Sequence, residues 1–503
     1  MAVLRESVMV DGDFTLSTWH GLFGKDWKLL LNSFTVATTV TVITLLLATL
    51  LAVKLLYCTK TGCRWLIITL MLSTISPPFV GSIAYLMLFG RRGLITWRLL
   101  GLEWNPYGFH GIVMMECVAQ LGIATLLVAA SFYKVDGTLE RASQDMGASR
   151  LYTLRHVSLP LASSGIMAAA SMVFVRSLSD FGTPLFVGGS FQVLASRAYN
   201  TLIGIGDFPL ACAMNALLVL PGILILAIHT PAHKDRFSLR LAGSRTLRLK
   251  GIYALLPEVA ACFFIVVELS VYGLIFAGSI TRTWGVDFTP TTAHLRSLWN
   301  FSGNGFARSL YCSLSAGVCS ALMGVIIARL LRTAPLRLKK LVQSLAELPY
   351  LMPGTFLGIG YLLVSSSLPW ELPAGFLIGA ICTFRQLSPS LWSAQAGMAQ
   401  VNPELELAVR DLGGSPLRAL FDIFLPALRP FVLVSFINAF SAAMTSTGPI
   451  IFLVSPYARV AAVELFESIN SGSYGDASAM SSLLILTIMA VNGLAWKAGK
   501  MRG

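Results

Sequence analysis

Long apolar stretches alternate with short polar segments along the whole chain, and most are long enough to cross a lipid bilayer. A backbone inside lipid must pair its own polar groups, so each stretch is predicted to be a helix. The pattern predicts spans near residues 30–53, 65–89, 111–133, 161–182, 208–229, 252–278, 308–331, 342–366, 373–396, 427–448 and 479–496. It therefore indicates an all-α polytopic membrane protein with about eleven spans, five followed by six.

A polar stretch between two spans occurs twice. After Leu139 the chain reads ERASQDMGASRLYTLRHVSLP, and after Leu405 it reads ELAVRDLGGSPLRALFDIFLP. Such self-similarity means two homologous halves. We expect a first half at residues 1–230 with a first loop at 138–160, a basic cytoplasmic linker at 231–251, and a second half at 252–503 with a second loop at 404–426. The matched residues, at one offset throughout, are Glu140 with Glu406, Asp145 with Asp411, Gly147 with Gly413, and Pro160 with Pro426.

Each loop is predicted to be a short polar helix that ends at a glycine, followed by a turn into the next span. Gly147 and Gly413 suit the left-handed conformation that often ends a helix. Pro160 and Pro426 suit the first turn of the next helix, where a missing N–H is no loss. One copy alone could equally be a plain linker between membrane helices. Two copies at corresponding places favour a docking element.

The loops resemble the EAA loop of the inner-membrane permeases of binding-protein-dependent ABC importers. That pattern has a Glu-Ala-Ala-like start, a glycine, and a branched aliphatic residue two positions before Leu-Pro. The matching residues are Gly147, Val157, Leu159 and Pro160 in the first loop, and Gly413, Ile423, Leu425 and Pro426 in the second. The opening triplet departs from the pattern, since it reads Arg141-Ala142-Ser143 and Leu407-Ala408-Val409.

The resemblance implies a multi-pass permease of the bacterial inner membrane in which each loop sits in a groove of a cytoplasmic ABC ATPase subunit. Two such subunits and a periplasmic solute-binding protein are the expected partners, besides the lipid bilayer. The chain itself would be no enzyme and would bind no cofactor, because the partner hydrolyses ATP. The coupling residues carried over by this resemblance are Glu140, Asp145, Gly147, Pro160, Glu406, Asp411, Gly413 and Pro426.

The cargo is suggested by two further segments, SDFGTPLFVGGSFQVLASRAYN and IIFLVSPYARVAAVELFESINSGSYGDASA. Together with the fused two-half layout they look like ferric-iron permeases. They are also similar to permeases for 2-aminoethylphosphonate and other phosphorylated solutes. Ferric iron is the leading expectation.

Composition agrees with a membrane protein, since 55% of residues are hydrophobic and only 12% are charged. The net charge of +13 does not indicate nucleic acid, because the basic residues are scattered through short loops and mark the cytoplasmic side. The chain has no phosphate-binding GxxxxGK[ST] loop, no HExxH and no paired CxxC motif. Cys58 and Cys63 share a loop, but their spacing is unlike a zinc pair, so no metal site is expected.

Charged residues inside spans are expensive in lipid and often face a protein interior or an aqueous path. Arg176 and Asp180 stand one turn apart and can form an ion pair at a helix end, or line the substrate pathway together with Ser446 and Thr447 of the second half. A second polar set, Glu116, Gln120, Arg385 and Gln386, is expected to make packing contacts between helices.

Two other functional classes are open to a chain with this pattern. A secondary transporter driven by an ion gradient is also built from repeats, but it would place carboxylates at the membrane centre of both halves. A structural membrane anchor would leave the twice-repeated loop without a purpose.

Asp13-Phe14-Thr15 resembles Asp287-Phe288-Thr289, yet only the second copy follows a complete span. We therefore expect one helix fewer in the first half, either because it was lost or because the start lies too far downstream.

Overall fold

The computed structural model describes residues 1–10, 13–58, 62–77, 79–91, 93–102, 104–229, 248–249, 251–299, 303–370, 372–402, 404–411, 413, 415, 418, 420–454 and 458–500. These residues are mostly helical, and the only strands among them form two short hairpins. The prediction of an all-α polytopic membrane protein is confirmed. Most of the predicted linker 231–251 lies outside the described residues.

The elements up to the linker are α1 (Ala2–Glu6), β1 (Met9–Val10), β2 (Asp13–Phe14), α2 (Ser17–Lys25), α3 (Trp27–Tyr57), α4 (Cys63–Ile75), α5 (Val80–Phe89), η1 (Leu94–Leu99), α6 (Phe109–Tyr133), α7 (Gly137–Asp145), α8 (Arg150–Thr153), η2 (Leu154–Ser158), α9 (Leu159–Leu178), α10 (Gly182–Val187), α11 (Leu194–Asn200), η3 (Thr201–Ile205) and α12 (Phe208–His229). The η elements are π-helical turns.

The elements after the linker are α13 (Ile252–Ile280), β3 (Thr281–Thr283), β4 (Asp287–Pro290), α14 (Ala293–Ser297), α15 (Gly303–Thr333), α16 (Leu336–Leu351), α17 (Gly354–Ser366), α18 (Ala374–Arg385), α19 (Leu387–Met398), α20 (Glu404–Asp411), η6 (Leu420–Phe424), α22 (Leu425–Ala427), α23 (Arg429–Met444), α24 (Ala461–Asn470) and α25 (Tyr474–Lys500).

The chain forms two compact units. The first unit comprises Ser7–Pro221 and Ile228–Ala293, and the second comprises Met1–Glu6, Gly222–Ala227 and His294–Gly503. Helix α13 follows the linker in sequence, yet it packs against α3, α4 and α5 in the first unit. A unit in space and a half of the sequence repeat are therefore different divisions of this chain.

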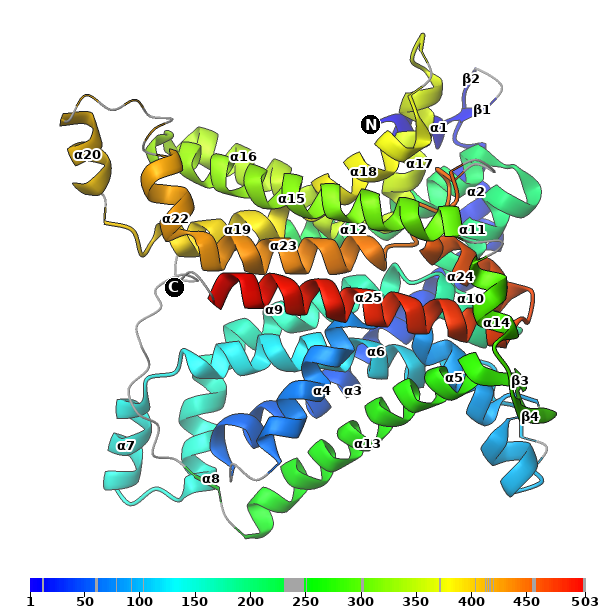
Figure 1. Cartoon of the computed structure of the whole chain (residues 1–503), viewed down its shortest axis with the longest axis horizontal. Helices are drawn as coiled ribbons and strands as arrows, with labels where there is room; N and C mark the ends of the chain where they lie inside the picture. The colour runs from blue at the N-terminus through cyan, green and yellow to red at the C-terminus, as the bar shows by residue number, and fades with distance from the viewer. Residues whose placement is uncertain are drawn as a thin grey trace. The chain divides into compact units, whose positions relative to one another are not determined.

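Three helices form the core of each unit. In the first unit α3, α6 and α9 pack against one another, with small residues such as Ala37, Ala124 and Ala169 fully buried at the contacts. Small side chains let helix backbones approach closely in lipid. In the second unit α15, α19 and α23 pack against one another in the corresponding way (Figure 1).

The two units repeat the same long-range hydrogen bonds. Near the start of α3 the Ser33 hydroxyl accepts the backbone N–H of Leu194, at 2.7 Å, where α11 begins. Near the start of α15 the Ser309 hydroxyl accepts the backbone N–H of Ala461, at 2.8 Å, where α24 begins. A buried helix end needs such a partner for its unpaired donors, so the internal repeat extends to individual contacts.

Seven helices in the described part of the chain are long and apolar enough to span a membrane, or up to ten if three bent helix pairs each count as one span. The pair α16–α17 bends by 106° just before Pro353, as expected where proline prevents a continuous helix. The predicted span at 373–396 is not among the ten. It is divided at Gln386 into α18 and α19, because Pro389 cannot donate a hydrogen bond to the carbonyl of Arg385.

Helix α13 is fixed to its unit by polar contacts along its length. Near its start Glu258 forms an ion pair with Lys54, whose side chain is only 1% exposed. Farther along, the Tyr272 hydroxyl donates to the carbonyl of Leu72, at 2.7 Å. After the helix ends, the Trp284 indole donates to the carbonyl of Met87, at 2.8 Å.

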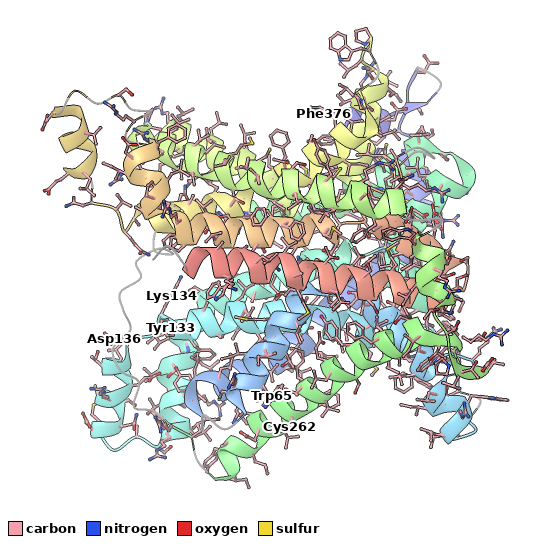
Figure 2. All side chains as sticks on the ribbon, viewed as in Figure 1. Trp65, Tyr133, Lys134, Asp136, Cys262 and Phe376 are labelled. Carbon is pink, nitrogen blue, oxygen red and sulfur yellow. The ribbon has the colours of Figure 1, made fainter. Side chains whose placement is uncertain are left out.

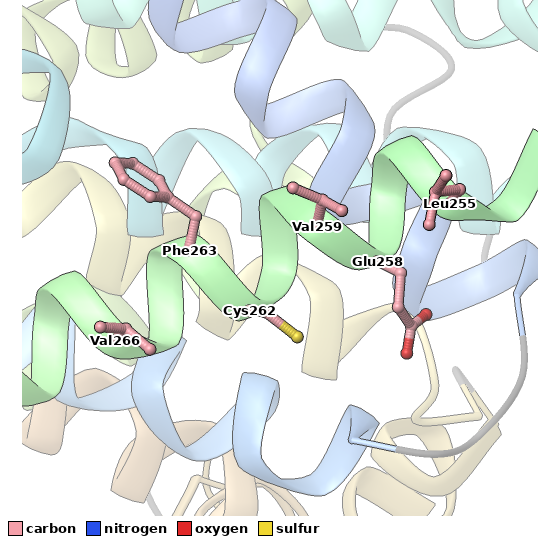
Figure 3. A pocket seen from close by; sticks show the side chains of 6 residues that line it. All are labelled: Leu255, Glu258, Val259, Cys262, Phe263 and Val266. Carbon is pink, nitrogen blue, oxygen red and sulfur yellow. The ribbon is translucent and has the colours of Figure 1, made fainter.

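The outer face of α13 is apolar. Glu258 borders a shallow groove on this helix, whose other lining residues in Figure 3 are Leu255, Val259, Cys262, Phe263 and Val266. Val259, Phe263 and Val266 are each more than half exposed. An exposed face of this composition suits contact with lipid.

We predict that Glu258→Gln lowers the free energy of unfolding by about 2–3 kcal/mol, because it removes the charge that neutralises buried Lys54. Thermal unfolding of the purified protein in detergent measures the change. The matched control is Glu467→Gln, which breaks a half-exposed ion pair with Arg459 and should cost at most about 1 kcal/mol. Equal losses in the two variants would contradict the prediction.

Candidate functional site

The first loop is a pair of short capped helices joined at a glycine. Figure 2 labels Asp136, at the N-terminus of α7, where its carboxylate accepts the backbone N–H of Thr138 at 2.9 Å. Gly147 follows α7 with φ of +88°, the left-handed conformation expected there. Ser149 then caps α8 by accepting the backbone N–H of Tyr152 at 3.2 Å.

The second loop has the same backbone design at every described position. Asn402 accepts the backbone N–H of Glu404 at 3.0 Å, where α20 begins. Gly413 has φ of +75°, and Ser415 accepts the backbone N–H of Arg418 at 3.2 Å. A π-helical turn leads into the next helix in both loops, with Pro160 and Pro426 in its first turn. Glu406 lies within α20, and its side chain is not described.

Glu140 lies inside the protein, not on the surface of the first loop. Its side chain is fully buried, and its Oε1 accepts hydrogen bonds from the hydroxyls of Tyr57 and Ser158, both at 2.7 Å. Tyr57 ends α3 and Ser158 ends η2, so one carboxylate ties three segments together. We expected Glu140 to face a partner protein; the structure instead places it where it holds α7 against the membrane helices.

The exposed surface of the first loop is small and partly apolar. Asp145 and Gly147 are exposed, and Met146 between them is 84% exposed. On α8, Leu151 and Tyr152 are also about half exposed. A protruding helix end with apolar side chains and an acidic residue has the features of a surface that inserts into a groove on another protein.

The second loop is held by a different interaction. Phe424, at the position that matches Ser158, is fully buried. The guanidinium carbons of Arg329 and Arg332 lie over its ring, at 5.0 Å and 5.8 Å from the centroid. A positively charged guanidinium is attracted to the face of an aromatic ring, so these are cation–π contacts. Asp411, Gly413 and Pro426 are exposed in this loop.

We predict that Glu140→Ala loosens the first loop, since it leaves two buried hydroxyls without their acceptor, at a cost of about 2–4 kcal/mol. Limited trypsin digestion of inside-out vesicles should then cut faster at exposed Arg141, Arg150 and Arg155. The control Asp145→Ala changes an exposed acid of the same helix and should leave the cleavage rate unchanged. Equal cleavage of wild type and Glu140→Ala would contradict the assignment.

The predicted pathway residues Arg176 and Asp180 form no ion pair in the described structure. Arg176 is exposed near the end of α9. Asp180 Oδ1 accepts the backbone N–H groups of Gly182 and Thr183, at 3.0 Å and 3.3 Å, so this carboxylate satisfies two unpaired donors at the start of α10. The ion-pair interpretation is therefore wrong for this structure, while a role in the substrate pathway stays a prediction.

The other predicted pathway residues lie just beyond α23. Thr447 is buried, and its hydroxyl forms no hydrogen bond within the described part of the chain. Ser446 is half-buried, and its backbone N–H bonds the carbonyl of Ala443. In the first unit, Glu116 of α6 is buried and accepts a hydrogen bond from the Ser177 hydroxyl of α9. Glu116 thus connects two helices, as expected for a packing contact.

A strained residue at the break between α4 and α5 was not predicted. Phe79 has φ of +68°, a conformation that costs a residue with a side chain about 1–2 kcal/mol. Its ring packs edge-on against Phe186 and lies against Gly182, where an added Cβ would come within 1.9 Å of the ring. The Pro77-Pro78 pair signalled the break in the helix but not this contact.

We predict that Gly182→Ala is destabilising by about 2–3 kcal/mol, because a Cβ there has no room unless Phe79 moves. Thermal unfolding of the purified protein measures the loss. Gly204→Ala is the control, since a Cβ at that position would meet nothing within 4 Å. If Gly182→Ala unfolded at the wild-type temperature, the close packing of Phe79 would be refuted.

The described residues contain no group of three or more His, Cys, Asp or Glu side chains that could hold a metal ion. Burial raises the pKa of the Cys58 thiol, although nearby Lys54 acts in the opposite direction. A raised pKa means that less of the thiol is ionised at neutral pH, and the thiolate is the reactive form.

Comparison with known proteins adds to these observations. Residues 45–236 match the family described as binding-protein-dependent transport system inner membrane component. The chain is 30% identical over 442 residues to the ferric transport system permease protein FbpB of Actinobacillus pleuropneumoniae, a match that covers 84% of this chain and 64% of that protein. It is 29% identical over 411 residues to the putative ferric transport system permease protein FbpB 1 of Haemophilus influenzae, with 77% and 64% covered.

A second kind of relative is similar over a shorter range. The putative 2-aminoethylphosphonate transport system permease protein PhnV of Salmonella typhimurium is 24% identical over 251 residues, which are 48% of this chain and 94% of that protein. The chain spans less than two thirds of the length of the two ferric relatives. The resemblance inferred from the two loops is confirmed.

Proposed function

Since the chain belongs to the family of binding-protein-dependent transport system inner-membrane components, we propose that it is the permease subunit of an ABC importer. It forms the solute pathway across the bacterial inner membrane. It takes energy from cytoplasmic ATPase subunits that dock on the first and second loops.

The observation that carries this proposal is the repeated design of the two loops. Each has a capped helix, a left-handed glycine at Gly147 or Gly413, a capped turn and a π-helical segment that enters a membrane helix. The first loop continues directly into α9, whereas the second loop reaches α23 through the short helix α22 and a bend of 62°. Two equivalent loops call for two ATPase subunits, and Asp145, Gly147, Asp411 and Gly413 are exposed to meet them.

The roles of the different subunits follow from the same arrangement. ATP is bound and hydrolysed by the partner, and this chain contributes neither a catalytic residue nor a cofactor. A periplasmic solute-binding protein delivers the cargo to the outer face. Glu140 acts within the permease, where it holds the first loop in position for docking.

The proposed cargo is ferric iron. Two relatives named as ferric transport system permeases are similar to the chain over 84% and 77% of its length, against 48% for the aminoethylphosphonate relative. Uptake of 2-aminoethylphosphonate is the alternative, because that relative is matched over almost its whole length.

We predict that the double variant Gly147→Val, Gly413→Val loses coupling to the ATPase. A β-branched residue is strongly disfavoured in the left-handed conformation, so both docking helices should lose their turn. We expect ATP hydrolysis stimulated by the loaded binding protein to fall at least about fivefold, with less ATPase subunit co-purified.

The matched control is Gly206→Val. Gly206 also has a positive φ, +79°, and open space around its Cβ position, but it lies between η3 and α12 and belongs to neither loop. This variant should retain stimulated hydrolysis. Full coupling in the double variant, at normal membrane levels, would refute the proposed docking sites.

A further inference from the structure

Four oxygen-bearing side chains form an acceptor cluster inside the first unit: Glu116, Gln120, Ser177 and Asp180. Glu116 and Gln120 are one turn apart on the same face of α6. Ser177 belongs to the last turn of α9 and donates to Glu116 Oε2, which fixes the two helices side by side. Asp180 lies three residues after Ser177, just beyond the end of α9.

Two oxygens of the acceptor cluster are buried without a hydrogen bond. Glu116 is 1% exposed and Gln120 is 7% exposed. Within the described part of the chain, Glu116 Oε1 and Gln120 Oε1 accept no hydrogen bond from any donor. A buried acceptor without a donor is costly, and a carboxylate oxygen is more so. A positively charged species that reached these oxygens would supply the partner that they lack.

The acceptor cluster has no basic partner among the described residues. Neither Glu116 nor Asp180 takes part in an ion pair among the described residues. Arg176, the nearest basic residue in sequence, is exposed. The available ligands are carboxylate, amide and hydroxyl oxygens, the set that hard metal cations prefer over softer ones.

We propose that the acceptor cluster is a transient binding site for a hard metal cation that crosses the membrane as cargo. This inference rests on the proposed importer function for its cargo. A site with two carboxylates is weaker than a dedicated metal centre, and weak binding suits a pathway, since the ion must also leave. The second half has no matching carboxylates, because its corresponding residues are Cys382, Gln386, Ala443 and Ser446.

The test is a titration of the purified full chain in lipid nanodiscs with Tb³⁺, a hard trivalent cation whose luminescence is sensitised by nearby aromatic residues. Glu116→Gln keeps the shape of the side chain and an acceptor for Ser177, but removes a charge. We expect it to weaken Tb³⁺ binding about tenfold, and Asp180→Asn to have a similar effect. The matched control is Glu268→Gln, another buried membrane glutamate, on α13 and outside the cluster.

Unchanged binding in Glu116→Gln, or an equal loss in Glu268→Gln, would overturn the proposal. So would the absence of Tb³⁺ binding by the wild type, which would mean that the carboxylates are held neutral by protons. Uptake of ferric ion by the whole importer in proteoliposomes provides the second readout. It should fall several-fold in Glu116→Gln and persist in Glu268→Gln; normal uptake in Glu116→Gln would refute the role of the cluster in transport.

The two proposals fail in different ways. If the wild type did not associate with an ATPase subunit, the importer function would be lost, whatever the titration gave. If the ATPase were coupled normally but Glu116→Gln bound Tb³⁺ as the wild type does, only the cation site would be lost.

Discussion

The need to pair every backbone N–H and C=O within lipid constrains this chain more than any single contact. Long uninterrupted helices meet that need by themselves, and α3, α6 and α15 do so over their whole length. Wherever a helix is interrupted, other groups must therefore pair with the backbone N–H and C=O groups that the break leaves free. The breaks before α5 and α17 coincide with prolines, and Asp180 supplies the acceptor for two N–H groups where α10 begins.

The internal repeat preserves backbone geometry more strictly than side-chain chemistry. Both loops keep the cap, the left-handed glycine and the π-helical turn at matched positions. Their attachment differs, since the first loop is held by a buried carboxylate, and the second by a buried aromatic ring that two arginine guanidinium groups contact. The two loops therefore have similar backbone shapes, but different mutations would weaken the contacts that hold them in place.

Much of this architecture could be predicted because it depends on local sequence. Spans follow from apolar runs, and the ends of the loop helices follow from Gly147 and Gly413. The burial of Glu140 could not be predicted, because its partner Tyr57 lies 83 residues away and no local sequence pattern indicates a contact over that separation. Pro389 marks the break at Gln386, but the apolar residues on both sides of it are typical of one continuous span. The packing of α13 with the first unit depends on tertiary contacts that periodicity does not encode.

The position of α13 has a consequence for the order in which this protein is made. Lys54 is buried by a partner, Glu258, that lies 204 residues farther along the chain. At ordinary rates of translation, that interval corresponds to about 10–40 s. The first unit is thus unfinished while most of its helices are already in the membrane, and Lys54 needs water, lipid headgroups or an insertion factor until α13 arrives.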